Sequence, residues 1–268
     1  MSVFNSIKLF IHPRVMTMLF LGFSAGVPIL LIFSTLGLWL NEAGVVKSTI
    51  TFFSWAALGY SFKFVWAPLV DRLPLPVITR ALGRRRAWML VSQLAIMGAI
   101  LLMSSVDPKA SVESLTIMAY GAVLLGFSSA TQDIVIDAYR IESADMDLQS
   151  MLSATYIAGY RIGMLVAGAG GLFIASYLGS TKELYSFDAW SGTYLMMAGV
   201  MLIGVATTLI INEPKSERKE TEFSTTDYSR FFLLFLSIVV AFILTFIATA
   251  DFVKTAKEIL TDTFANKH

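Results

Sequence analysis

Long runs of apolar residues separated by short polar breaks dominate the chain. A helix that crosses a bilayer needs about 20 mostly apolar residues, and these runs have that length. The pattern predicts seven apolar helices, over residues 15–40, 50–69, 88–106, 115–136, 151–177, 190–211 and 231–250. The first six are expected to pack as one unit, residues 1–212, so the sequence predicts an all-α, polytopic transmembrane helix bundle.

Basic residues are divided unequally between the loops on alternate sides of these helices. Twelve Lys and Arg residues fall on the side of the N-terminus, and three fall on the other side. Loops on the cytoplasmic side of a membrane carry the excess of Lys and Arg. We therefore expect a cytoplasmic N-terminus, with the end of the sixth helix on the same side.

A polar stretch rich in Glu, Lys, Ser and Thr follows the sixth helix. Residues 213–230 are expected to form a cytoplasmic linker, and residues 231–268 an extra hydrophobic helix with an amphipathic tail. Residues 231–250 could span the membrane, or they could lie on it or re-enter it. The apolar face of the tail is typical of an interfacial helix, and equally of a helix that packs on a partner.

The composition narrows the functional classes. Hydrophobic residues make up 56% of the 268 residues and charged residues only 15%, whereas roughly a quarter of a soluble protein is charged. A net charge of +1 gives no basic excess for binding nucleic acid. Cysteine is absent and the two histidines lie near the termini, so we expect no metal, no cofactor and no catalytic nucleophile.

Several ionisable residues are predicted at membrane depth, where a charged side chain costs at least about 2.5–3.5 kcal/mol and usually faces a cavity or a partner. Lys63 and Arg161 should lie near the middle of their helices, while Asp133 and Asp137 share one helix face with Gln132 beside them. One interpretation is a polar cavity in which the cations attract an anionic substrate and a carboxylate takes up protons. The alternative is a structural ion pair, of Asp133 with Arg161 or with Lys63.

Small residues are spaced at four-residue intervals in two of the predicted helices. Gly159 and Gly163 fall on one face of the fifth helix, and Gly22 and Gly26 on one face of the first, followed by Pro28. Such faces allow helices to approach closely. Pro28 removes a backbone donor and is expected to kink its helix.

A charged loop between the second and third helices carries a resemblance to a known family. It contains Asp71-Arg72 and, after an insertion, Gly83 followed by three arginines. This resembles the G-x-x-x-D-R-x-G-R-[RK] loop of the major facilitator superfamily. We expect Asp71 to pair with an arginine or a helix N-terminus, and the basic cluster to sit among lipid headgroups. The residues expected to form a cytoplasmic gate or fix the topology are Asp71, Arg72, Arg84, Arg85, Arg86 and Arg140.

Narrower strings resemble the AmpG muropeptide permeases within that superfamily. They lie at residues 21–28, 60–68, 129–140 and 159–168, and the resemblance runs from about residue 11 to residue 214. It implies the N-terminal six-helix half of a facilitator fold, here followed by one extra hydrophobic helix. The residues that it suggests for substrate binding or proton coupling are Lys63, Gln132, Asp133, Asp137, Tyr160 and Arg161.

The resemblance also implies a function. Such a permease of a bacterial inner membrane imports 1,6-anhydromuropeptides for cell-wall recycling, driven by protons. The peptide carboxylates would suit the cations, and Gln132 and Tyr160 would suit neutral polar groups. A facilitator has two six-helix halves, so the chain is expected to be incomplete and to need a separate C-terminal half or a second copy.

Three alternatives remain open at this stage. A facilitator of this type could carry another anionic solute, such as an acyl-CoA. The chain could also be a half-transporter remnant or scaffold that transports nothing. An enzyme fits least, because Asp133 and Asp137 could do acid–base work but have no nucleophile or metal set beside them.

Overall fold

The computed structural model describes residues 12–53, 58–75, 77–144 and 146–214, together with residues 226, 227, 229, 230, 233, 234, 236, 237 and 240. The chain divides into two units, Met1–Lys219 and Glu220–His268. The described residues of the second unit are all helical. Most of the predicted helix 231–250, and all of the tail after it, lie outside the described residues.

Among the described residues of the first unit, five helices are long and apolar enough to cross a membrane, and each matches a predicted helix. Three of them contain a π-helical turn or a short break. The helices run over Pro13–Glu42 (α2 Pro13–Leu30, η1 Leu31–Thr35, α3 Leu36–Glu42), Arg84–Ser104 (α8), Val112–Ser143 (α9), Met146–Tyr177 (α10 Met146–Leu165, η4 Val166–Gly170, α11 Gly171–Tyr177) and Phe187–Ile210 (α12 Phe187–Val200, α13 Leu202–Ile210).

The predicted second helix, residues 50–69, is not continuous among the described residues. Its pieces are α4 (Lys47–Phe53), α5 (Leu58–Phe62), the 3-10 turn η3 (Lys63–Val65) and α6 (Ala67–Arg72), and a short α7 (Ile78–Leu82) follows. Pro68 lies in the first turn of α6, and a proline ring clashes with the carbonyl four residues earlier, here that of Phe64. The prediction of one continuous helix is therefore wrong between α5 and α6. The 3-10 turn η3, which interrupts it, carries Lys63.

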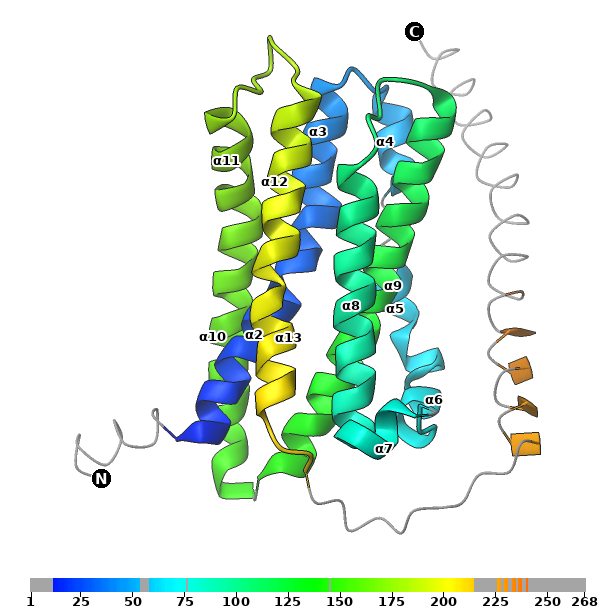
Figure 1. Cartoon of the computed structure of the whole chain (residues 1–268), viewed down its shortest axis with the longest axis vertical. Coiled ribbons are helices and arrows are strands. Elements are labelled where there is room, and N and C mark those ends of the chain that lie inside the picture. Colours follow the sequence, from blue (N-terminus) through cyan, green and yellow to red (C-terminus); the bar gives the residue numbers. More distant parts are fainter. Residues whose placement is uncertain are drawn as a thin grey trace, which may run out of the picture. The chain divides into compact units, whose positions relative to one another are not determined.

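The chain passes back and forth between the two ends of the bundle (Figure 1). α2 begins, and α13 ends, at the end where α7 lies, which we call the basic end because it holds Arg84, Arg85, Arg86 and Arg140. α3, α4 and α11 lie at the opposite end, which we call the far end. The pieces α4, α5 and α6 descend from the far end to the basic end, so the segment makes a crossing in parts.

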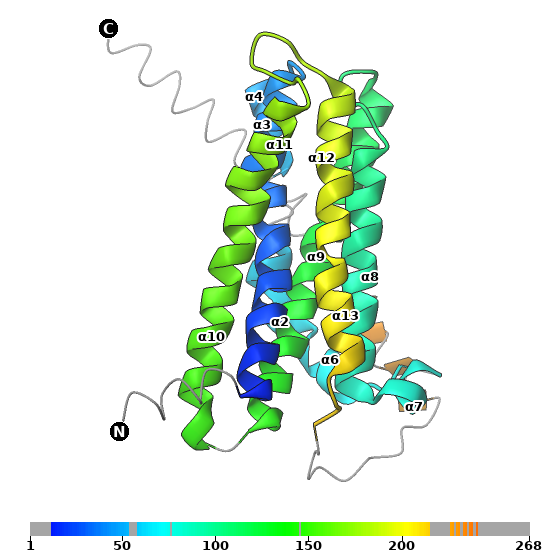
Figure 2. The ribbon, with the colours of Figure 1, turned by 60° about the vertical axis from the view of Figure 1, so that its left-hand side comes forward.

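α2 and α10 are the most closely packed pair of helices, and they lie side by side in both views (Figure 2). A Cβ added at Gly26 would lie 2.0 Å from the carbonyl oxygen of Tyr160, and one added at Gly159 would lie 2.0 Å from that of Leu19. No side chain fits at these positions. The close approach predicted from the small residues is confirmed, and it fixes which face of α10 turns inward.

Large aromatic side chains fill the core toward the far end. The rings of Trp39 and Trp190 stack with 5.8 Å between their centroids and an interplanar angle of 4°. Tyr194 lies against Trp39 and donates a hydrogen bond of 2.9 Å to the Leu31 carbonyl, in the π-helical turn of the first long helix. Thr35 of the same turn donates to the Ala167 carbonyl in η4 at 3.1 Å. One side-chain hydrogen bond thus joins the two π-helical turns, and another joins the first turn to α12.

Candidate functional site

A lysine and an aspartate meet inside the bundle. Asp133 lies on α9 and is 7% exposed, and its carboxylate is 3.9 Å from the ammonium of Lys63 in η3. The Lys63 side chain is 37% exposed. The structure thus pairs Asp133 with Lys63, which is one of the two pairs considered from the sequence. The distance lies at the upper limit for an ion pair, so the contact is loose.

Tyrosines surround this carboxylate. The Tyr156 hydroxyl of α10 donates to Asp133 over a long 3.5 Å. Tyr160 lies one turn further along the same helix, with 6.0 Å between the two ring centroids. Tyr60 of α5 donates to the Ser129 hydroxyl on α9 at 2.8 Å. Two helices, α5 and α10, therefore present phenol groups near one weakly held carboxylate on α9.

Two buried glutamines extend the polar interior toward α2 and α13. Gln132 is fully buried and donates from its amide to the Ser24 hydroxyl at 3.2 Å, while its amide oxygen has no hydrogen-bond partner. Gln93 of α8 accepts from the Thr208 hydroxyl at 2.9 Å, and its amide nitrogen lacks a partner. Buried polar atoms are nearly always paired. The amide oxygen of Gln132 and the amide nitrogen of Gln93 could therefore each form a further hydrogen bond.

Arg161 is not part of this cluster. It is exposed on α10, where its guanidinium lies 3.9 Å from the sulfur of Met164. The face of α10 that packs on α2 is the one with Gly159 and Gly163, and Arg161 is two residues away from each. Two residues correspond to about 200° around a helix, so Arg161 points away from α2.

The next charged residues of α9 form a second, more exposed pair. The Asp137 side chain is 47% exposed, and its carboxylate lies 3.3 Å from the guanidinium of Arg140. Arg140 also donates to the Ser153 hydroxyl on α10. This pair links α9 to α10 between the Lys63–Asp133 pair and the basic end.

Arg85 is the centre of a dense ion network at the basic end. Its guanidinium donates two hydrogen bonds to the Glu142 carboxylate, at 2.6 and 2.9 Å, and one to Asp71 at 2.6 Å. The side chain is only 3% exposed. The predicted pairing of Asp71 with an arginine is confirmed, whereas the headgroup location expected for this cluster is wrong for Arg85. The carboxylates of Asp71 and Glu142 hold that arginine between α6, α8 and α9.

The other arginines of the loop have different surroundings. Arg86 donates to the carbonyls of Thr208 and Leu209 at the C-terminus of α13, where a cation is favoured. Arg84 is partly buried and Arg72 is exposed. Glu213, which follows α13, accepts from the backbone N–H groups of Arg85 and Arg86 at 2.8 and 3.1 Å. A carboxylate from the end of the bundle therefore caps the first turn of α8.

Sequence reasoning missed Tyr60, Tyr156, Glu142 and Glu213. Glu142 offers a weak signal, because it is an acidic residue close to Arg140 in the helix that carries the buried Asp133. Glu213 offers none, since its partners are 127 and 128 residues away in the chain. Among the residues that the structure describes, no group of three His, Cys, Asp or Glu could hold a metal ion.

Comparison with known proteins places the chain in a family. The model of the Major Facilitator Superfamily matches residues 15–256. A protein of Rickettsia conorii that bears the transporter name AmpG 4 is 36% identical over 213 residues, which cover 80% of this chain and 49% of that protein. An anhydromuropeptide permease of Escherichia coli is 36% identical over 209 residues, covering 78% of this chain and 39% of the permease.

The helical bundle, the charged loop and the family match together define a multi-pass membrane protein of a transporter family. The chain belongs to the Major Facilitator Superfamily. Within it, the resemblance to the AmpG muropeptide permeases is confirmed by relatives, one named AmpG 4 and one named anhydromuropeptide permease. The chain spans about half of the length of the first of these relatives, and less of the second.

Proposed function

We propose that this chain forms one half of an inner-membrane permease that imports anhydromuropeptides together with protons. The observation that carries the proposal is the Lys63–Asp133 pair, a loose contact of 3.9 Å between a partly exposed ammonium and a buried carboxylate. A carboxylate withdrawn from water takes up a proton more readily than one in water. Protonation of Asp133 would release Lys63, whose ammonium could then meet a substrate carboxylate.

The relatives support the substrate class. One of them is named for anhydromuropeptides. These compounds carry both sugar hydroxyls and peptide carboxylates. In this chain Lys63 is a partly exposed cation beside the cluster, and Gln132 has an unmet amide oxygen. Arg161, exposed on α10, supplies a second cation on a surface that a second half would cover. Asp137 and Tyr160 are proposed to assist at the same cluster.

The Arg85 network is proposed to act as a cytoplasmic gate. Asp71, Arg85 and Glu142 join α6, α8 and α9 by short contacts at the basic end. Arg86 and Glu213 bind α13 to α8, and Arg140 ties α9 to α10. Arg72 and Arg84 add positive charge that keeps this end in the cytoplasm.

Uptake of labelled anhydromuropeptide tests the proposal. Cells expressing the chain with a C-terminal half should accumulate the label, and Asp133→Asn should abolish accumulation while the protein remains inserted. Asp147→Asn is the matched control, because Asp147 is an exposed aspartate at the start of α10. Normal accumulation in the Asp133 variant would refute the coupling role. Competition by acyl-CoA but not by unlabelled muropeptide would refute the substrate class.

The orientation has a separate test that uses the absence of cysteine from the chain. A single cysteine at Arg80 at the basic end, or at Lys182 in the loop between α11 and α12, marks each side, and both residues are exposed. A membrane-impermeant maleimide added to intact cells should label Lys182→Cys and spare Arg80→Cys. The reverse pattern would invert the proposed topology.

A further inference from the structure

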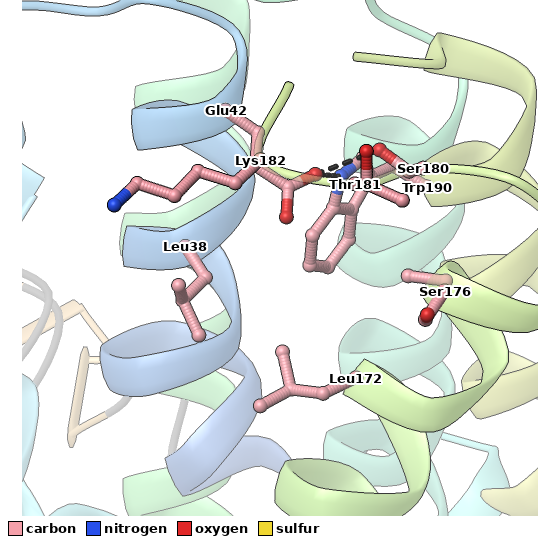
Figure 3. A pocket seen from close by; sticks show the side chains of 9 residues that line it. Leu38, Glu42, Leu172, Ser176, Ser180, Thr181, Lys182 and Trp190 are labelled. Atoms are coloured by element: carbon pink, nitrogen blue, oxygen red, sulfur yellow. Dashed lines mark hydrogen bonds between the residues drawn. The ribbon is translucent and has the colours of Figure 1, made fainter. Parts of the chain in front are cut away.

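A cavity of about 310 Å³ lies at the far end, away from the Lys63–Asp133 pair. It is open on one side and is lined by α3, α11, the loop that follows α11, and α12 (Figure 3). Its apolar walls are Leu38, Leu172, Ala175 and the indole of Trp190, and its polar groups include Glu42 and Ser176. Since one water occupies about 30 Å³ in the liquid, the volume would hold about ten waters or a small organic group.

Glu42 is held in a fixed position in this cavity. One of its carboxylate oxygens accepts two hydrogen bonds of 2.7 Å, from the Ser180 hydroxyl and from the indole N–H of Trp190. Both donors are almost completely buried, at 2% and 1% exposure. Figure 3 shows the second carboxylate oxygen turned toward the apolar walls. The carboxylate is therefore oriented by the fold and keeps one oxygen available.

No cation neutralises this carboxylate among the residues that the structure describes. The ion pairs of the described chain lie elsewhere, at Lys63, Arg85 and Arg140. Lys182 contributes to the cavity wall, but Figure 3 shows its ammonium directed away from Glu42. An unpaired negative charge in an apolar-walled space strongly favours a cation over an anion or a neutral group.

We propose that this cavity binds the ammonium group of a primary amine, with Glu42 as its counter-ion. A hard metal ion would need six or more oxygen ligands, which one carboxylate and nearby hydroxyls do not supply. An alkylammonium needs only the free carboxylate oxygen, and its carbon chain can lie against Leu38 and Leu172. The indole of Trp190, which lines the cavity, gives an aromatic wall that suits a cation.

The amine could come from two sources that share this chemistry. One is the headgroup of an aminophospholipid, since the cavity lies at the end of membrane-spanning helices. The other is a water-soluble amine, such as an amino group on a transported solute. The proposal does not depend on the role assigned to Asp133, and each can fail without the other.

The test uses the full chain in lipid nanodiscs. In phosphatidylglycerol discs at pH 7, n-butylammonium chloride should raise the thermal unfolding temperature in a saturable manner, whereas equal sodium chloride should not. Glu42→Gln keeps an acceptor for Ser180 and Trp190 but loses the charge, so the half-saturating concentration should rise about tenfold. Glu183→Gln, an exposed glutamate in the adjoining loop, is the matched control and should behave as the wild type.

Discs that contain phosphatidylethanolamine separate the two sources. If the headgroup occupies the cavity, these discs should already show the higher unfolding temperature, and n-butylammonium should add little. If soluble amines are bound, both kinds of disc should respond alike. Ser176→Lys, at an exposed position beside the cavity, supplies a tethered ammonium and should remove the response in either case. Absence of any amine response, or an equal response in Glu42→Gln, would overturn the proposal.

Discussion

Arg85 and Lys63 are both cations held against carboxylates between helices, yet their surroundings differ sharply. Arg85 is 3% exposed and is bound by two carboxylates through contacts of 2.6 to 2.9 Å. Lys63 is 37% exposed and lies 3.9 Å from a single carboxylate. A guanidinium that binds a carboxylate in a bidentate manner is hard to displace, whereas an ammonium far from its carboxylate can exchange its partner. The arrangement at Arg85 suits a fixed connection between helices. The arrangement at Lys63 suits a contact that forms and breaks.

The backbone is regular around Arg85 and irregular around Lys63. Arg85 lies in the first turn of α8, a continuous helix that Glu213 caps. Lys63 lies in the 3-10 turn η3, at the place where Pro68 prevents a regular helix. Short 3-10 stretches within helices often mark hinges. A change of partner at Lys63 can therefore be accompanied by a change in its own segment.

The largest effect on stability is expected for Arg85→Met. Removing one partner of a buried ion network leaves Asp71 and Glu142 without compensation, and we expect a loss of about 3 kcal/mol. Thermal or denaturant unfolding in detergent micelles would measure it. Arg80→Met is the control, because Arg80 is exposed in the same loop region, and its effect should stay within about 0.5 kcal/mol. Equal losses in the two variants would remove the distinction drawn for Arg85.

A smaller effect on stability is expected for Lys63→Met. The pair is long and its lysine is more than one-third exposed, so we expect less than about 1 kcal/mol in the same unfolding experiment. Uptake should nevertheless fall strongly, because the proposed partner of the substrate carboxylate is lost. A stability loss as large as that of Arg85→Met would show that Lys63 serves as a structural anchor.

The smallest effect on stability is expected for Tyr156→Phe. Its hydroxyl donates over 3.5 Å, which is a weak hydrogen bond, and we expect a change of less than about 0.5 kcal/mol. The variant should shift the pH dependence of uptake if Tyr156 influences the protonation of Asp133. Tyr177→Phe is a suitable control, because Tyr177 is exposed at the far end of the same long helix. An unchanged pH profile would remove Tyr156 from the coupling site.

Much of the fold could be predicted from the apolar pattern, because membrane-spanning helices need long apolar runs. The five long helices appear where the runs are, and Gly22, Gly26, Gly159 and Gly163 correctly indicate the closest helix contact. The break at Lys63 could not be located, although Pro68 is visible in the sequence, because a proline can begin a helix or interrupt one. The predicted domain limits 1–212, 213–230 and 231–268 remain predictions.

The candidate site was predictable in its residue types but not in its partners. Asp133 and Lys63 stand out as charges within apolar runs, but only packing decides between Lys63 and Arg161 as partner. The position of Arg161 follows from Gly159 and Gly163 once those glycines are known to face α2. Which of three successive arginines is buried could not be inferred, since Glu142 and Glu213 reach the cluster from distant parts of the chain.

Proton movement tests the central claim most directly, that the loose Lys63–Asp133 pair is a protonation switch. In cells expressing the chain with a C-terminal half, adding anhydromuropeptide should acidify the cytoplasm, as reported by a pH-sensitive fluorescent protein. Cells with the Asp133→Asn variant should take up neither protons nor labelled anhydromuropeptide. Cells with the Asp147→Asn variant should behave as the wild type. Acidification at the wild-type rate in Asp133→Asn would contradict the account.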